Sequence, residues 1–539
     1  MNKIILNANY LVINALKAIK NKNYIEAKNL LDKAVSINPE MFEANHNLAI
    51  LNFQLGNLDS SIFYFEKSKK LKPKSPQIYF NLALAYDKKK DIDLAIINFK
   101  KVIKLEPNNS IAFYNLGCLY KKKLESTKAE EYLIKSLDLN PNFIKTYDDL
   151  FSLYDQTNQI NKFSSLLKKI KKTLSEKDLV SFYEAIYTYN QKNFKQTIQI
   201  LENLNFKENY FAHNITKHSL LAKSYDRINE FDKAYNHFKI NNELVIKSYG
   251  KDINEKSFVQ LVNKRIEFYK DFNTNRWSQY SLKDKFSQPI FLIGFPRSGT
   301  TLLDTILRTN KSIEVIEEKP ILRNFLRNLE IKTKNNFDYL DDLDQEFIHN
   351  MQNVYFKERE QYQENKKAKI IIDKMPLNII YIGEILRFFP NAKFIFALRN
   401  PYDSVLSCFM QQFELNPAMK NFTSLESSAI LYDLVMKLWT IYRGVFSINC
   451  HFIKYEDVVT DFEKTTKDIF RYLEINWSDD AKNFHITAKK RLNISTPSYN
   501  QITSPLYSRS MSRWKNYEKE FKGIRNILDP WVDEFNYKI

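Results

Sequence analysis

The sequence predicts an α-solenoid of repeated helix pairs, followed by an α/β domain with a central parallel sheet. Two observations support this fold class. The first half of the 539-residue chain repeats with a fixed period, and the second half alternates short apolar runs with longer helical patterns. A chain of this length can form two or three hydrophobic cores. We expect a repeat array over 1–245, a charged helical linker over 246–285 and a second domain over 286–539.

The composition is that of a globular protein, with 44% hydrophobic and 27% charged residues. No apolar run reaches the length of a membrane span, and the N-terminus lacks a secretion signal. The three cysteines are far apart, which favours a cytoplasmic, reducing setting. The net charge of +18 is best explained by lysine-rich solvated helix faces. Since no basic cluster is interleaved with aromatics, we expect no nucleic-acid partner.

The period of the first half is 34 residues, and four classes of position keep it: prolines, small residues, large apolar residues and leucines. They are Pro39, Pro73, Pro107 and Pro141; Ala27, Ser61, Ala95 and Ala129; Leu31, Phe65, Phe99 and Leu133; Leu48, Leu82, Leu116 and Leu150. Small residues suit close helix approach, and each proline ends a second helix. The pattern resembles tetratricopeptide repeats.

The repeat pattern weakens after residue 144 and then recovers. The weakened copy is marked by Ala185, Thr197 and Leu201, and the recovery by Leu221, Ala222, Tyr225, Ala234 and Phe238. Such arrays offer a concave face to polypeptides. We therefore expect a polypeptide acceptor or protein partner there, while a scaffold or homodimer surface without a substrate role fits the repeats equally well.

Short apolar runs in the second half predict buried strands at 290–293, 369–373, 393–398 and 451–455. Helical patterns lie between them, at 378–389, 402–413, 425–445 and 462–473. Alternation of this kind predicts a parallel sheet covered on both faces. Ligands of such sheets bind beyond the carboxyl ends of the strands, and the notable polar motifs fall there.

The first motif is the turn from Gly294 to Gly299, which leads from the first strand into a helix. Unpaired N–H groups and the helix dipole make such a turn an anion cradle. Its spacing is that of the nucleotide-phosphate loop, but Thr300 replaces the usual lysine and Arg297 supplies the charge. The turn resembles the 5′-phosphosulfate loop of sulfotransferases that use 3′-phosphoadenosine 5′-phosphosulfate (PAPS). That resemblance implies cofactor contacts from Arg297, Ser298, Gly299, Thr300 and Thr301.

The second motif follows the strand at 393–398, where Arg399 precedes a helix that carries Ser407 two turns later. The two side chains can converge on one anion. The pair resembles the 3′-phosphate signature of the same family. Two phosphate sites imply a nucleotide phosphorylated at both ends, which ATP is not.

The third and fourth motifs are Glu317-Glu318, expected at the start of a helix, and Lys374 after the second predicted strand. Here the sequence resembles the protein-tyrosine sulfotransferases. The resemblance implies that Glu318 is the base for the phenolic proton, since a tyrosine of pKa about 10 is a poor nucleophile at neutral pH. It also implies that Lys374 neutralises the departing phosphate. No histidine follows Lys374 closely, which favours Glu318 as the base.

The fifth motif is the C-terminal run from Ser498 to Arg513 and Trp514, which resembles a Ser, Gln, Pro and basic-Trp series of the tyrosylprotein enzymes. By this resemblance Ser498 assists the sulfuryl group or the nucleotide, and Arg513 contacts a phosphate in place of a lysine. Tyr455 matches a nucleotide-contacting tyrosine. The chain departs from the animal enzymes at Ser504, where they carry lysine, and at Gln411, where they carry arginine.

Together these motifs, over roughly residues 288–520, predict a P-loop-like, PAPS-dependent sulfotransferase domain behind a tetratricopeptide array. The layout resembles a bacterial family. The acceptor hydroxyl is expected to be a protein tyrosine, with a carbohydrate, lipid or small phenol as alternatives, because the motifs read only the cofactor. An ATP-dependent kinase or NTPase, or a non-catalytic repeat scaffold, is disfavoured. The resemblance implies no metal.

Overall fold

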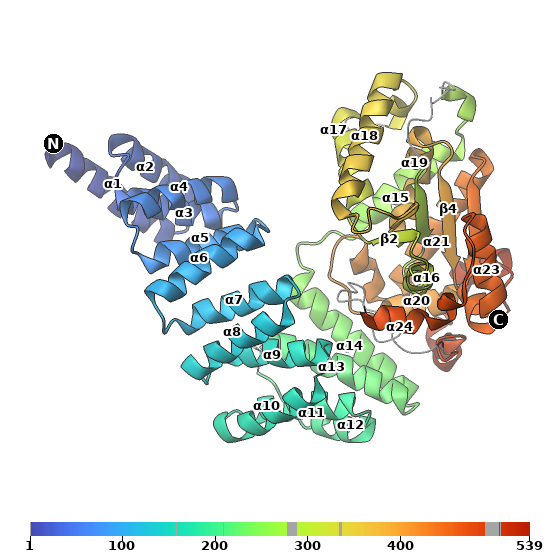
Figure 1. Ribbon diagram of the computed structural model, residues 1–539, viewed down its shortest axis with the longest axis horizontal. Helices are drawn as coiled ribbons and strands as arrows, with labels where there is room; N and C mark the ends of the chain where they lie inside the picture. The colour runs from blue at the N-terminus through green and yellow to red at the C-terminus, as the bar shows by residue number, and fades with distance from the viewer. Residues whose placement is uncertain are drawn as a thin grey trace. The chain divides into compact units, whose positions relative to one another are not determined.

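The computed structural model divides the chain into two compact units, Met1–Gln191 and Lys192–Ile539. It describes residues 2–157, 159–207, 210–277, 288–333, 337–490, 506 and 508–538. Figure 1 shows a helical first unit and a second unit that contains a strand sheet. None of the helices in the described ranges combines the length and apolar character needed to cross a bilayer.

The first unit consists of antiparallel helix pairs. Its helices are α1 (Asn2–Lys20), α2 (Tyr24–Ile37), α3 (Phe42–Gln54), α4 (Leu58–Leu71), α5 (Pro76–Lys88), α6 (Ile92–Leu105), α7 (Ser110–Lys122), α8 (Ser126–Leu139), α9 (Ile144–Gln156), α10 (Ile160–Thr173) and α11 (Lys177–Asn190). The 34-residue period is therefore one helix pair, as predicted.

The periodic small residues are the points where paired helices touch. Ala27, Ala95 and Ala129 have no exposed surface. At Gly117 an added Cβ would come within 2.6 Å of the Leu133 side chain, so α7 and α8 approach too closely there for any larger residue. The predicted prolines each follow the second helix of a pair by two residues, since proline cannot extend the hydrogen-bond ladder.

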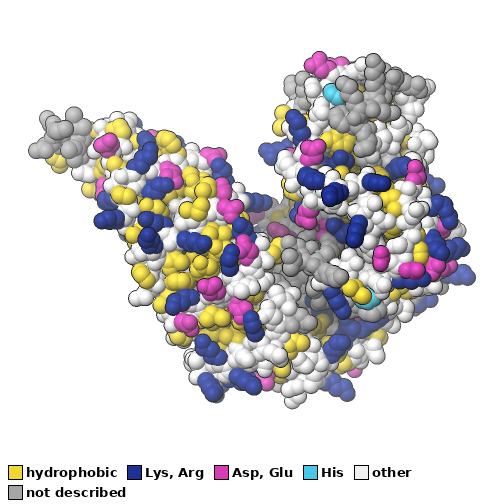
Figure 2. Space-filling view, in the orientation of Figure 1, with side chains coloured by type: hydrophobic (Ala, Val, Ile, Leu, Met, Phe, Trp, Pro, Cys, Tyr) yellow, Lys and Arg dark blue, Asp and Glu magenta, His cyan; other side chains and the backbone are white. Residues whose placement is uncertain are grey.

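The charge of the repeats is dispersed over their surface. On the face that Figure 2 shows, Lys and Arg side chains alternate with Asp and Glu and with hydrophobic residues. Many of the lysines pair with carboxylates of neighbouring helices, as Lys122 does with Asp87 at 2.5 Å. This arrangement agrees with solvated helix faces as the origin of the basic composition.

The second unit begins with helices that continue the repeat pattern and then contains the α/β domain. Its elements are α12 (Phe194–Glu202), α13 (Phe211–Arg227), α14 (Phe231–Tyr249), α15 (Lys256–Lys270), η2 (Thr274–Arg276), β1 (Ile290–Gly294), α16 (Thr300–Leu307), β2 (Ile313–Glu317), α17 (Ile321–Thr333), η3 (Phe337–Leu340), α18 (Gln345–Tyr362), β3 (Ile370–Lys374), η4 (Pro376–Tyr381), α19 (Ile382–Phe388), β4 (Lys393–Leu398), α20 (Pro401–Phe409), η5 (Met419–Thr423), α21 (Leu425–Val445), β5 (Asn449–Lys454), α22 (Tyr455–Thr460), α23 (Phe462–Tyr472), η6 (Asp479–Asn483), α24 (Phe484–Lys490), η7 (Arg513–Phe521) and α26 (Arg525–Glu534).

The sheet is parallel throughout, with strand order β2-β3-β1-β4-β5. Since β1 is the central strand, the loop after it lies between the carboxyl ends of β3 and β4. This is the position where a parallel sheet opens to ligands. The predicted central parallel sheet is confirmed.

Helices cover both faces of the sheet, as the sequence predicts. On one face, aliphatic side chains of the strands pack against α16, α23 and α24 in a core that includes Leu292, Ile306 and Ile469. On the other face the strands present aromatic rings. Phe291 packs on Tyr355 of α18 at 5.9 Å, and Phe396 packs on Trp439 of α21 at 4.7 Å between ring centroids.

Strand β2 corrects one sequence-based expectation. Glu317 and Glu318 were expected to begin a helix, but Glu317 ends β2 and α17 begins only at Ile321. The strand pairs with β3 so that Glu317 lies opposite Lys374. The pair of glutamates is therefore held by the sheet edge.

Candidate functional site

The loop after β1 has the predicted strand, turn and helix. Arg297 and Gly299 both adopt left-handed backbone angles, with φ of 69° and 96°. A Cβ at Gly299 would lie 2.9 Å from the ring of Tyr455, so glycine is required there for two independent reasons. The Oγ of Ser298 is buried and has no hydrogen-bond partner among the described residues. Together with the first-turn N–H groups of α16, this leaves donors directed at the loop.

The end of β4 brings the second motif onto the same loop. Asn400 caps α20 by accepting from Tyr402 N and Asp403 N, which fixes Arg399 at the strand end. The Arg399 guanidinium donates to Arg297 O at 3.0 Å through Nη1. It lies over the Tyr455 ring, 5.1 Å from the centroid. Its Nε is buried without a hydrogen-bond partner within the described ranges.

Ser407 lies within reach of the same loop. Its Oγ accepts a hydrogen bond of 3.1 Å from Arg297 Nε. The fold therefore brings together four residues that span more than 150 positions of the sequence. They are Arg297 after β1, Arg399 after β4, Ser407 of α20 and Tyr455 of α22. Two guanidiniums, a hydroxyl and an aromatic face are a donor set that suits a phosphorylated nucleotide.

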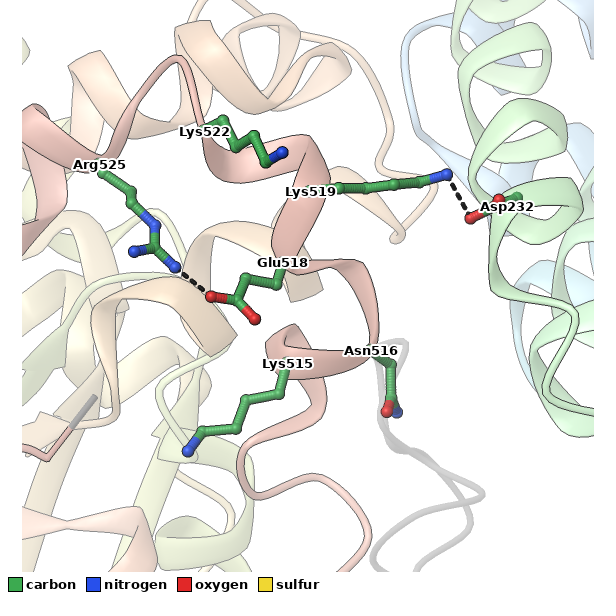
Figure 3. Close-up of a pocket in the computed structure, with 7 residues that line it drawn as sticks. All are labelled: Asp232, Lys515, Asn516, Glu518, Lys519, Lys522 and Arg525. Atoms are coloured by element: carbon green, nitrogen blue, oxygen red, sulfur yellow. Dashed lines mark hydrogen bonds and ion pairs between the residues drawn. The ribbon is translucent and has the colours of Figure 1, made fainter.

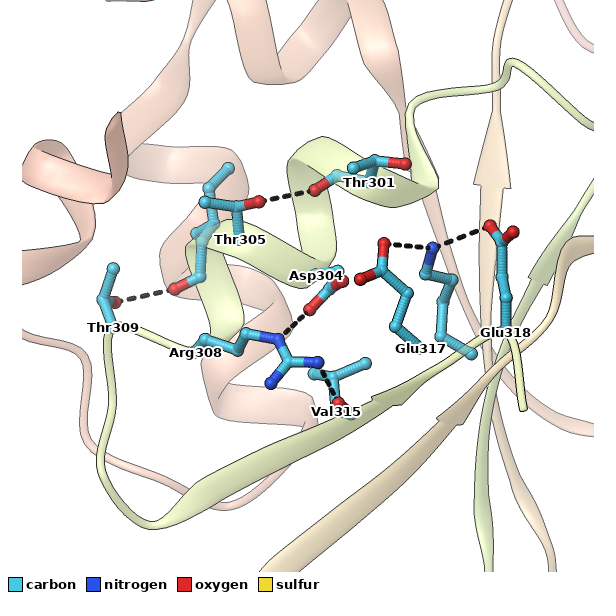
Figure 4. A network of polar contacts seen from close by, with 10 residues as sticks. Thr301, Asp304, Thr305, Arg308, Thr309, Val315, Glu317 and Glu318 are labelled. Carbon is cyan, nitrogen blue, oxygen red and sulfur yellow. Dashed lines mark hydrogen bonds and ion pairs between the residues drawn. The ribbon is translucent and has the colours of Figure 1, made fainter. Parts of the chain in front are cut away.

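The ends of β2 and β3 form a second cluster, which Figure 4 shows. The Nζ of Lys374 donates to Glu318 Oε1 at 2.9 Å and to Glu317 Oε1 at 3.2 Å. Lys374 has no exposed surface, whereas the Glu318 side chain is 36% exposed. Glu318 has a left-handed φ of 50°, and its N–H donates to Lys374 O at 2.8 Å.

The charge of Lys374 is maintained by its neighbours. Burial alone would lower its pKa, but Glu318, Glu317 and Asp304 together raise the pKa above the usual value. Asp304 lies on α16, directly after the phosphate-type loop, and also pairs with Arg308. Lys374 therefore stays cationic at neutral pH although no part of it contacts solvent.

The C-terminal segment closes over the end of β4. Asp403 accepts hydrogen bonds from Ser512 N at 2.7 Å and from Trp514 N at 2.9 Å. Arg399 Nη2 donates to Ser510 O at 2.6 Å. Arg513 lies at the start of η7 and pairs with Asp226 of α13 at 2.8 Å.

Most of the predicted site residues thus fall at the carboxyl ends of the strands. Arg297, Ser298, Gly299, Thr300 and Thr301 form the loop and the first turn of α16. Ser498 lies outside the described residues. Sequence reasoning missed Asp304, Asp403 and Asp226, because each contacts the site through residues distant in sequence: Lys374 for Asp304, Ser512 and Trp514 for Asp403, and Arg513 for Asp226.

A basic cavity of about 600 Å³ lies in the same unit, but no predicted site residue lines it. Its lining is Asp232, Lys515, Asn516, Glu518, Lys519, Lys522 and Arg525, as Figure 3 shows. Both acids of the lining are paired, Asp232 with Lys519 and Glu518 with Arg525.

Comparison with known proteins agrees with this arrangement. Residues 289–479 match the family model described as "Sulfotransferase family", and residues 18–79, 76–109 and 98–131 match tetratricopeptide repeat models. The second unit therefore contains a sulfotransferase-family domain and the first unit contains tetratricopeptide repeats, which are modules for protein–protein interaction. These matches support sulfotransfer in general.

Relatives extend the comparison beyond these segments. An uncharacterized protein of Aquifex aeolicus is 26% identical over 59% of this chain and 43% of its own length. Protein-tyrosine sulfotransferase A of Caenorhabditis elegans is 25% identical over 42% of this chain and 60% of its own. Protein-tyrosine sulfotransferase 2 of Gallus gallus is 24% identical over 42% and 62%. The chain thus spans less than two thirds of these relatives.

Among solved structures, a tetratricopeptide repeat protein from Parabacteroides merdae is 15% identical, with a TM-score of 0.37. The match covers 46% of this chain and 95% of the other.

Proposed function

We propose that this chain, with its sulfotransferase-family domain and tetratricopeptide repeats, transfers the sulfuryl group of PAPS to a protein tyrosine. The observation that carries the proposal is the convergence of two clusters at the carboxyl ends of the parallel strands. One cluster, around Arg297 and Arg399, suits the phosphates of a nucleotide. The other, around Lys374 and Glu318, pairs a buried cation with a partly exposed carboxylate.

The first cluster fits a nucleotide phosphorylated at both ends. Ser298 Oγ and Arg399 Nε are buried donors without hydrogen-bond partners in the described part of the chain, which is costly unless a ligand satisfies them. The loop at Gly294 and Gly299 has no room for a Cβ. In this proposal the loop, with Arg297, holds the 5′ side, and Arg399 and Ser407 hold the 3′-phosphate.

PAPS supplies an activated sulfuryl group and leaves as 3′-phosphoadenosine 5′-phosphate (PAP). Lys374 then offers a fixed positive charge to the phosphate that carries the negative charge after transfer. Glu318 accepts the proton of the acceptor hydroxyl. Glu317, only 7% exposed, stays paired with Lys374 when Glu318 turns to the acceptor, so the buried cation is never left without a carboxylate.

The acceptor is proposed from the protein-tyrosine sulfotransferases among the relatives and from the Glu318–Lys374 arrangement. A peptide with one tyrosine, a peptide with phenylalanine in its place, a small phenol and a host lysate would each be incubated with the protein and radiolabelled PAPS. Label on the tyrosine peptide alone or on both hydroxyl compounds supports the proposal. Label only on host carbohydrate or lipid contradicts the tyrosine assignment while retaining sulfotransfer.

The nucleotide is tested separately by calorimetry. We expect PAP to bind far more tightly than ATP or ADP. Arg399→Ala is expected to lose about 1.5–3 kcal/mol of PAP binding, the usual value of a hydrogen bond to a charged group. Arg471→Ala is the matched control, because Arg471 is exposed and its ion pair in the described part of the chain is with Asp468 on its own helix. Equal affinities for PAP and ATP would contradict the proposal.

A further inference from the structure

A single buried carboxylate on a repeat-type helix binds the C-terminal segment of the catalytic domain. Asp226 of α13 is 4% exposed. It accepts hydrogen bonds from Tyr517 OH at 2.7 Å, Arg513 Nε at 3.3 Å and Arg509 Nη2 at 3.2 Å. All three donors lie more than 280 residues further along the chain. None of the motifs recognised in the sequence includes Asp226.

Asp226 contacts one edge of the Arg513 guanidinium and so fixes its orientation. Nε and Nη2 of Arg513 both face Asp226 Oδ1, at 3.3 Å and 2.8 Å. Nη1 is not among the nitrogens that contact Asp226, and it lies on the opposite edge of the guanidinium. Because a guanidinium is planar and rigid, fixing one edge also fixes the direction of the other.

Arg513 lies in the same neighbourhood as the predicted 3′-phosphate site. Asp403 interacts with both arginines. Burial raises the pKa of Asp403, and the charges of Arg399 and Arg513 offset part of that rise. The backbone between them is held as well. Ser510 O accepts from Arg399, and Trp514 N donates to Asp403. Asp226 and Asp403 thus hold the segment from both sides.

The number of charges around this segment favours an anion. Arg297, Arg399, Arg509 and Arg513 supply four cations. Among the described residues, Asp226, Asp403 and Glu456 are acids that interact with one or more of them. Burying a carboxylate as deeply as Asp226 is costly unless it is fully paired. Here it is paired with two arginines, so that a net positive charge remains for a ligand.

We propose that Asp226 is a positioning residue for nucleotide binding: it orients Arg513 so that Nη1 reaches a phosphate of the bound nucleotide. The inference rests on the proposed function. It makes the helix pair α13–α14, which carries the repeat pattern, part of the cofactor site.

The test is a double-mutant cycle on the full-length protein, with PAP affinity measured by calorimetry. Asp226→Asn and Arg513→Ala are each expected to weaken PAP binding by about tenfold or more. The double variant is expected to bind no more weakly than Arg513→Ala, because Asp226 acts through Arg513. Asp232→Asn is the control, since Asp232 is 75% exposed, lies on α14 and also pairs with a cation of η7, Lys519 (Figure 3).

The possible outcomes separate this inference from the proposed function. Wild-type protein that does not bind PAP contradicts the proposed function. Wild-type affinity in Asp226→Asn, or losses that multiply in the double variant, overturns the positioning role alone. If near-UV circular dichroism shows that Asp226→Asn does not fold, Arg513→Lys replaces it. The lysine ammonium cannot contact Asp226 and a phosphate through two fixed edges as a guanidinium can. A loss of PAP affinity in Arg513→Lys like that of Arg513→Ala supports the inference, and wild-type PAP affinity overturns it.

Discussion

Lys374 illustrates how a single residue can be held ready for chemistry. It is an ammonium without exposed surface, bound by one buried and one partly exposed carboxylate. Removing water from such a charge costs several kcal/mol, which the two carboxylates offset. Glu317 is 7% exposed and Glu318 is 36% exposed, and the proposed function therefore assigns the acceptor hydroxyl to Glu318.

We predict that Glu318→Gln leaves PAP affinity nearly unchanged and lowers turnover by about 10²–10⁴-fold, the usual contribution of a positioned base. Glutamine can still accept a hydrogen bond from Lys374 but cannot take a proton. Turnover and PAP affinity would be measured on the same preparations. Glu317→Gln is the matched control. It is expected to lower the free energy of unfolding and to affect turnover less than Glu318→Gln does. Near wild-type turnover in Glu318→Gln would show that another base is used.

Gly299 allows a second prediction at this scale. Gly299→Ala combines a left-handed backbone, costing about 1–2 kcal/mol, with a Cβ placed 2.9 Å from the Tyr455 ring. We expect PAP affinity to fall by at least tenfold. Gly523→Ala is the control, because a Cβ at Gly523 has no atom within 4 Å. Equal PAP affinity in the two variants would mean that the loop is more adaptable than its geometry indicates.

Secondary-structure elements show where sequence reasoning succeeds and where it fails. The loop after β1 and α21 could be predicted, because an apolar run before a glycine turn and a long amphipathic period are local signals. Strand β2 could not, because two of its five residues are glutamates. Glu314 is buried since it accepts the N–H groups of Glu364 and Asn365, at 2.7 Å and 3.2 Å. Partners 50 and 51 residues away in sequence cannot be recognised from the residues around Glu314.

The helix pair α13–α14 contains two histidines whose ring nitrogens lie 2.9 Å apart, His218 and His237. Burial, the neighbouring His237 and Lys217 lower the pKa of His218 to about 4 from 6.5. Burial also lowers the pKa of His237. The unfolded chain therefore binds more protons than the folded protein between these values. The stability that the pair contributes is fully present above about pH 6.5 and is lost as the pH falls toward 4.

We predict that wild-type protein loses about 1–2 kcal/mol more stability than His218→Asn between about pH 7.5 and about pH 5, after allowance for partial exposure. Asparagine keeps a polar group near Nδ1 but does not titrate. Denaturant midpoints of both proteins at both pH values would measure this. Burial raises the pKa of Asp373 to about 7, so protonation of Asp373 stabilises the folded protein as the pH falls. This contribution is the same in both proteins and cancels in the comparison. Parallel pH profiles would contradict the prediction.

At the scale of the whole molecule, the compact units and the sequence pattern divide the chain at different places. The repeat pattern ends near residue 245, whereas the second unit begins at Lys192. The reason is that α14 packs on the α/β domain. Asn242 donates to Phe409 O at 3.0 Å and to Thr423 O at 3.2 Å, and the ring of Tyr235 packs on that of Phe409 at 5.2 Å. The sequence shows that these residues are helical but not which surface they cover.

Two fragments test this division. A fragment that starts at Lys192 is expected to unfold in a single transition and to bind PAP like the full chain. One that starts at Lys251 lacks Asp226 and Asn242, and it exposes the Phe409 surface to water. We expect the shorter fragment to aggregate or to bind PAP at least tenfold more weakly. Equal solubility and PAP affinity of the two fragments would show that α12–α14 are dispensable for the catalytic unit.

The Lys192 fragment also tests what the tetratricopeptide repeats of the first unit do. If that unit binds a polypeptide acceptor, its removal should raise KM for the polypeptide strongly and change activity on a small phenol much less, because remote binding energy is what the fragment loses. With a net charge of +18, attraction to an acidic acceptor should weaken as salt rises. The full chain should show a stronger salt dependence with the polypeptide than the fragment, because removing the first unit removes only part of the positive charge. If both proteins sulfate the polypeptide equally well, the repeats are a scaffold or dimer surface, and a non-protein acceptor becomes the better candidate.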